Sequence, residues 1–205
     1  MSSSIYSSIV DAIVQTTFIE WLIFIMAMAY VILAAIENVW CWLFGILASV
    51  LSVYLCYSGN LFLESGLQVF YVIIGIYGWY EWLHGSKNKT ELPIISYSLT
   101  KIFYLILIGI IIWIPFGYIA RNYSTQALPY LDAYITAFSI VATWMTAKKI
   151  IQNWIFWIVI DALAVFLYAS RSFYLIALLY SIYTVLSILG YFQWKRKIHP
   201  PSGSL

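Results

Sequence analysis

The sequence predicts an all-α integral membrane protein with seven transmembrane helices, arranged as two parallel three-helix repeats joined by a linker helix. Of the 205 residues, 64% are hydrophobic and 9% are charged, whereas a soluble domain has roughly 45–50% apolar and about 25% charged residues. The apolar residues form long continuous runs, unlike the alternating segments of a β-barrel. One sequence pattern also occurs twice.

The repeated pattern relates the two halves of the chain. Residues 67–71 (LQVFY), closed by 78–82 (GWYEW), return 112 residues later as 179–183 (LYSIY), closed by 190–194 (GYFQW). Three single residues also match, at spacings of 115, 115 and 114: Asn38 with Asn153, Trp42 with Trp157, and Tyr54 with Tyr168. Duplication inside an apolar chain is typical of carriers whose substrate site lies between the halves.

Seven runs are long enough to cross a bilayer, which takes about 20 residues of helix. They are residues 20–36, 39–57, 66–83, 99–119, 130–147, 154–169 and 173–194. We expect one transmembrane domain over residues 19–197, with repeat one at about 19–84, the linker span at about 99–119 and repeat two at about 130–197. Because three spans per repeat is an odd number, the single linker span makes the repeats parallel.

The two ends of the chain are assigned outside this domain. Residues 1–18 predict either a frayed tail or a short helix in the membrane interface, since Ile5, Ile9 and Ile13 follow a helical spacing. This stretch lacks the basic start and cleavage pattern of a signal peptide. Residues 198–205 are a C-terminal tail.

The basic residues predict the orientation. With seven spans, eight of them fall on or near one face and two, Arg121 and Arg171, on the other. The eight are Lys87, Lys89, Lys101, Lys148, Lys149, Lys195, Arg196 and Lys197. Since basic loops stay cytoplasmic, we expect a cytoplasmic C-terminus and an N-terminus that is periplasmic or outside the cell.

Polar residues inside the spans are the candidates for a substrate site. Asp161 lies near the middle of the sixth span, where a carboxylate facing lipid costs about 2.5–3.5 kcal/mol. Trp154 and Trp157 share its helix face, with Asn153 at the cytoplasmic rim. Such a face suits a flat, hydroxylated, weakly cationic ligand. The alternative is that the tryptophans form an interfacial belt and Asp161 bonds a neighbouring helix.

Further candidates lie in the repeated segments. Gln68 and Tyr71 belong to a stripe on the third span, and Tyr180 lies in the matching segment of the second copy. Asn38 mirrors Asn153 in the alignment above, either as an equivalent residue at the cytoplasmic rim or as a helix cap.

Other functions lack the motifs they need. The isolated His84 and His199 have no ligand partners at metal spacing, so neither a metal nor another cofactor is expected. No glycine loop for ATP phosphates and no serine nucleophile elbow occur, which argues against an enzyme. A net charge of +2 without a basic patch excludes a nucleic-acid partner.

The motifs resemble those of PnuC-type nicotinamide riboside transporters, which share a SWEET-like layout. The resemblance is carried by Asn-Trp-x-x-Trp at 153–157, Gly-Trp-x-x-Trp at 78–82, and the segments at 42–45, 67–71, 143–149 and 167–175. It implies a carrier of the bacterial inner membrane that moves a vitamin precursor by facilitated diffusion, with cytoplasmic phosphorylation trapping the product.

The resemblance leaves the substrate open between nicotinamide riboside and thiamine. Thr143 stands where such transporters often carry glutamine, and Gly75 stands where some carry a polar side chain. A change of polar partner changes the preference of a site. A homo-oligomer is compatible with the sequence. A membrane sensor or assembly subunit that uses the same helices only for packing is the alternative from another class.

Overall fold

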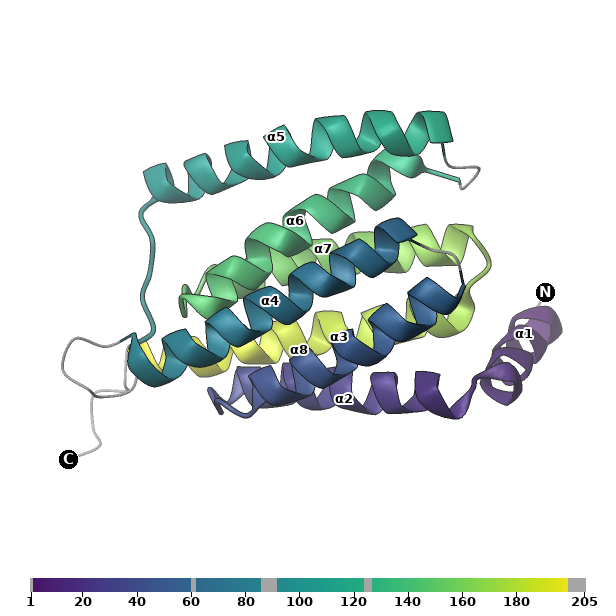
Figure 1. Ribbon diagram of the computed structural model, residues 1–205, viewed down its shortest axis with the longest axis horizontal. Coiled ribbons are helices and arrows are strands. Elements are labelled where there is room, and N and C mark those ends of the chain that lie inside the picture. Colours follow the sequence, from purple (N-terminus) through teal and green to yellow (C-terminus); the bar gives the residue numbers. More distant parts are fainter. Residues whose placement is uncertain (1, 60–61, 86–91, 124–126, 199–205) are drawn as a thin grey trace.

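The computed structural model describes residues 2–59, 62–85, 92–123 and 127–198, and these form eight helices (Figure 1). The helices are α1 (Ser2–Gln15), α2 (Phe18–Ala35), α3 (Cys41–Ser58), α4 (Phe62–His84), α5 (Leu99–Tyr123), α6 (Pro129–Ala147), α7 (Asn153–Ser170) and α8 (Tyr174–Ile198). Lys87, Lys89, His199 and residues 199–205 of the expected tail lie outside the described residues.

Within the described part of the chain, five helices are long and apolar enough to cross a membrane: α2, α3, α5, α7 and α8. The prediction of an all-α membrane protein is therefore confirmed at this level. Each of the seven predicted spans coincides with one of the helices α2 to α8, although α4 and α6 are not among the five candidates. Both carry acidic residues, Glu64 and Glu81 in α4 and Asp132 in α6.

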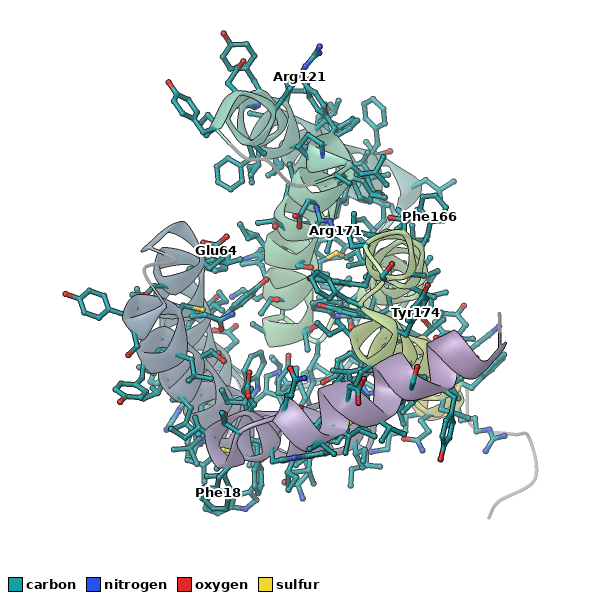
Figure 2. The ribbon with its side chains drawn as sticks, turned by 90° about the vertical axis from the view of Figure 1, so that its right-hand side faces the viewer. Phe18, Glu64, Arg121, Phe166, Arg171 and Tyr174 are labelled. Atoms are coloured by element: carbon teal, nitrogen blue, oxygen red, sulfur yellow. The ribbon has the colours of Figure 1, made fainter. Side chains whose placement is uncertain are left out.

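Most of the N-terminal stretch, Ser2–Gln15, forms the helix α1. It ends before Thr17, whose backbone N–H donates to Glu20 Oε2 at 2.7 Å while Glu20 N–H donates to Thr17 Oγ1 at 3.4 Å. This reciprocal pair satisfies free N–H groups at the start of α2. The chain therefore turns at Thr16 and Thr17, and α1 runs across the end of the bundle (Figure 2).

Six helices form a closed ring. The helices α2, α3 and α4 pack in succession, as do α6, α7 and α8, and the ring closes where α4 meets α6 and α2 meets α8. Among the described helices, α5 contacts α6 alone, and it is set apart from the ring (Figures 1 and 2).

Contacts between the two halves are reciprocal. Trp82 Nε1 donates to the Thr146 carbonyl at 3.2 Å, and Trp194 Nε1 donates to the Ala34 carbonyl at 3.1 Å. The donors Trp82 and Trp194 are 112 residues apart, and so are the acceptors Ala34 and Thr146. Each half thus gives the other the same hydrogen bond, as two copies facing one another across a twofold axis would.

These contacts correct part of the sequence alignment. A β-carbon on Gly78 would lie 2.4 Å from the ring of Trp42, and one on Gly190 would lie 2.7 Å from the ring of Trp154. Trp42 therefore corresponds to Trp154 and not to Trp157. The matches at spacings of 114 and 115, including Asn38 with Asn153, were wrong because Trp154 and Trp157 lie one turn apart and either could be aligned.

Candidate functional site

A cavity of about 270 Å³ lies between the two halves. Helices α2 and α4 of the first half line it, together with α6, α7 and α8 of the second. The lining residues are Ala27, Tyr30, Val31, Ala34, Tyr71, Ser139, Thr146, Trp154, Trp157, Asp161, Tyr180, Tyr183 and Ser187. The site thus lies where a duplicated carrier is expected to hold its substrate.

The structure brings together five of the eight residues that the sequence singles out. Tyr71, Trp154, Trp157, Asp161 and Tyr180 all line the cavity, although three helices supply them. The other three, Asn38, Gln68 and Asn153, lie outside the lining.

Asp161 is the charged residue of the lining. Its side chain is 3% exposed, and its Oδ2 accepts a hydrogen bond from the Ser187 hydroxyl at 3.2 Å. Both side chains lie in the wall formed by α7 and α8. A buried carboxylate with one neutral partner is a strong attractor for a cation that enters the cavity.

Asn153 reaches the site through Thr146. It is fully buried, its Nδ2 donates to the Ile150 carbonyl at 2.7 Å, and its Oδ1 lies 3.2 Å from Thr146 Oγ1. That hydroxyl in turn accepts from Trp157 Nε1 at 3.4 Å. The same hydroxyl also lies 2.9 Å from the Ala142 carbonyl. Asn153 is therefore linked to the cavity-lining indole of Trp157 through Thr146, although it does not itself line the cavity.

Tyrosines form an aromatic corner beside Asp161. The Tyr168 and Tyr180 rings stack with centroids 5.3 Å apart and planes 8° apart, and Tyr183 meets Tyr180 edge-on at 5.8 Å. Tyr71 belongs to the first half, and its hydroxyl is in hydrogen-bonding contact with Ser139 of the second half. Flat rings and hydroxyl groups thus surround the carboxylate.

The two walls differ in polarity even though their backbones are related. Ala27 and Ala34 of α2 correspond, 112 residues on, to Ser139 and Thr146 of α6, and all four line the cavity. The first half therefore offers a largely apolar wall and the second half a polar one. A ligand with one apolar face and one hydroxylated face would have a single favoured orientation.

Asn38 has a local role. Its Oδ1 accepts a hydrogen bond from the Trp40 backbone N–H at 3.0 Å, immediately before α3 begins. The bond closes a turn just ahead of α3, whose N-cap residue is Trp40 and has no side-chain cap bond. Gln68 lies on α4 and does not line the cavity. Tyr180, which lies 112 residues later and is its counterpart in the second repeat, does line it.

Sequence reasoning missed most of α2 and several hydroxyl groups. The missed residues are Ala27, Tyr30, Val31, Ala34, Ser139, Thr146, Tyr183 and Ser187. Tyr183 could have been found, because it is the repeat counterpart of Tyr71. Ala27, Val31 and Ala34 carry no signal that separates them from lipid-facing residues.

The described residues contain no group of three His, Cys, Asp or Glu side chains that could hold a metal ion.

A helical membrane protein that holds such a cavity between two related halves belongs to the class of small-molecule transporters. The sequence model of the nicotinamide mononucleotide transporter family matches residues 17–196, and the chain belongs to that family.

Relatives in several bacteria carry names of the same kind. The nicotinamide riboside transporter PnuC of Escherichia coli (strain K12) is 26% identical, over 79% of this chain and 78% of the relative. The PnuC of Neisseria mucosa is 27% identical over 79% and 66%. The riboflavin/roseoflavin transporter RibM of Streptomyces davaonensis is 22% identical over 77% and 75%.

One solved structure shares the fold. The crystal structure of the vitamin B3 transporter PnuC superposes with a TM-score of 0.72 at 20% identity, covering 95% of this chain and 88% of the other. The two chains therefore share the fold.

Proposed function

We propose that the protein takes up nicotinamide riboside by facilitated diffusion, and that phosphorylation of the riboside inside the cell keeps it there. The observation that carries the proposal is the single carboxylate, Asp161, set among aromatic rings in the cavity between the halves. Nicotinamide riboside joins a flat ring with a fixed positive charge to a sugar rich in hydroxyl groups. Each of these parts has a complementary group in the lining.

The candidate residues take distinct roles in this proposal. Asp161 faces the positive ring, and Trp154, Trp157 and Tyr180 contact its flat surface. Tyr71 and the hydroxyl groups of the second half bond the sugar. Asn153 positions Trp157 through Thr146.

Gln68 and Asn38 remain candidates of another kind. Both lie outside the lining of this conformation. They would contact the riboside only after α3 and α4 move during the transport cycle.

For the membrane arrangement we propose seven spanning helices in a three, one, three order. Repeat one holds α2 to α4, α5 is the linker span, and repeat two holds α6 to α8, all within residues 19–197 of one domain. The reciprocal tryptophan bonds support parallel repeats. The basic residues support a cytoplasmic C-terminus in the inner membrane of a bacterium, with α1 on the periplasmic side in the membrane interface.

Thiamine is the alternative substrate, because its thiazolium ring is also a flat cation that Asp161 could attract. Riboflavin, which RibM is named for, is neutral and has three fused rings. A cavity of about 270 Å³ lies just below the range of about 300–1,000 Å³ typical of ligand sites. Cavity size and charge thus both favour a small cationic nucleoside over riboflavin.

Calorimetric titration of the purified protein separates these ligands. We expect nicotinamide riboside to bind most tightly, thiamine less tightly, and riboflavin and neutral nicotinamide weakly. Tighter binding of thiamine than of riboside would show that the substrate is thiamine, and the proposal that the protein is a carrier would stand.

Cells that lack their own riboside carrier test the mode of transport. Labelled riboside should accumulate in cells that express this protein together with a riboside kinase. Without the kinase it should only reach the distribution that the membrane potential sets for a cation. Accumulation of unmodified riboside that persists without the kinase after the membrane potential has been collapsed would indicate coupling to an ion gradient.

A further inference from the structure

Two residues of opposite charge that correspond in the repeat contact each other. Lys149 Nζ lies 3.1 Å from Glu37 Oε2, and the two positions are 112 residues apart. Residues related by a twofold axis can touch only on that axis. The ion pair therefore lies on the axis between the two halves, and its side chains are only 9% (Glu37) and 3% (Lys149) exposed.

Both residues have a backbone conformation that favours glycine. Glu37 has a φ of 60° and Lys149 a φ of 49°, each two residues beyond the last residue of its helix, α2 or α6. Glycine usually takes this place after a helix, because a β-carbon there costs roughly 1–2 kcal/mol. Strain of this kind is retained where a side chain is needed for function.

The pair lies next to the cavity. Ala34 and Thr146 line the cavity, and their carbonyls accept the reciprocal bonds from Trp194 and Trp82. Glu37 and Lys149 follow them by three residues, so they form the next layer along the axis. The Lys149 ammonium also lies 4.6 Å from the centre of the Trp82 ring.

A second cation supports Glu37 from the outside. Lys197 Nζ lies 2.8 Å from Glu37 Oε1, but the Lys197 side chain is 62% exposed. An exposed pair of this kind contributes little, while breaking the buried pair leaves an uncompensated charge. We therefore expect the removal of Lys149 to destabilise the protein more than the removal of Lys197 does.

We propose that the Glu37–Lys149 ion pair, with the layer formed by Trp82 and Trp194, is the gate that closes the cavity on the side of the C-terminus. In the closed state the two charges hold the ends of α2 and α6 together. When the halves part on this side, the pair separates and both charges become hydrated. The proposal rests on the proposed transport function.

A cysteine in the cavity reports whether the gate is closed. We would place Val31→Cys, which lines the cavity, in a protein with Cys41→Ala and Cys56→Ala, and apply a membrane-impermeant thiol reagent to each side of reconstituted vesicles. Glu37→Gln should raise the rate of labelling from the side of the C-terminus by about tenfold or more, which corresponds to about 1.4 kcal/mol or more of lost gate stability. Lys195→Gln, which removes a charge on the same side without touching the pair, is the matched control and should change nothing.

The symmetry of the pair allows a rescue. Glu37→Lys combined with Lys149→Glu should return labelling close to the starting rate, since each side chain then occupies the related position of the other. If Glu37→Gln does not fold, Lys149→Gln carries the test, with Lys197 still beside Glu37. Labelling that stays unchanged in a folded single variant, or a reversed pair as open as the single variant, would overturn the gate.

The labelling experiment needs no substrate. A protein that transports no riboside could still show a gate, and a transporter could still show none. Failure of the gate and failure of the transport function are therefore distinguishable.

Discussion

Replacing Asp161 with asparagine removes the charge of the cavity and keeps its shape. The carboxylate is 3% exposed, and asparagine can still accept the hydrogen bond from Ser187. At a separation of about 5 Å and an effective dielectric constant of about 20, a carboxylate attracts a positive ring by about 3 kcal/mol. Because the cation also loses water, we expect Asp161→Asn to weaken riboside binding by about 1–3 kcal/mol, a five- to 150-fold change.

Calorimetry of the purified variant should use two ligands of nearly the same shape. Nicotinamide riboside is a cation, and its reduced dihydro form is neutral. The variant should lose affinity for the cation and keep its affinity for the neutral form. Ser187→Ala removes a hydrogen bond but leaves the charge. It should therefore weaken riboside binding by only about 0.5–1.5 kcal/mol.

Equal losses for the two ligands would show that Asp161 supports packing and does not attract the cation. Unchanged affinity for both, with an unchanged melting temperature, would remove Asp161 from the site. A lower melting temperature with unchanged affinity would give it a structural role between α7 and α8.

Three further predictions concern packing, positioning and orientation. Gly78→Ala should destabilise the protein by about 1–3 kcal/mol, seen as a lower melting temperature, because its β-carbon would meet the Trp42 ring at 2.4 Å, while Gly66→Ala, with nothing within 4 Å, should not. Asn153→Ala should weaken riboside binding less than Asp161→Asn does, because it acts on Trp157 through Thr146; an equal or larger loss would place Asn153 in direct contact with the ligand. A C-terminal reporter active only in the cytoplasm should be active, and an active periplasmic reporter would contradict the orientation.

The helices could be predicted because lipid imposes a simple rule on sequence. A span must be long and apolar, so the runs from 99–119 and 154–169 mark α5 and α7 to within a few residues. Helix ends depend on local bonds instead. The start of α2 is set by the Thr17–Glu20 pair, and α4 begins at Phe62, before the apolar run at 66–83.

The site could be predicted where the sequence violates that rule. Asp161 is too costly to face lipid, and it identifies the face of α7 that includes Trp154 and Trp157. The wall formed by α2 obeys the rule, since Ala27 and Val31 suit lipid and cavity equally well. It becomes visible only when the two halves are packed together.

The ion pair on the axis was missed for a different reason. Glu37 and Lys149 become partners only at a spacing of 112 residues. The sequence alignment placed Asn38 opposite Asn153, at a spacing of 115, and this separated the two charges. An alignment of repeats must therefore be correct to the residue before it identifies contacts between them.

Counterflow in vesicles that contain only the purified protein tests most directly whether this chain is a carrier. Vesicles loaded with unlabelled nicotinamide riboside should transiently concentrate labelled riboside from outside, without ATP and without an ion gradient. Vesicles with the Asp161→Asn variant should need a higher riboside concentration for the same rate. Uptake no greater than that of empty vesicles, for both riboside and thiamine, would contradict transport and favour a packing or sensing role for the same helices.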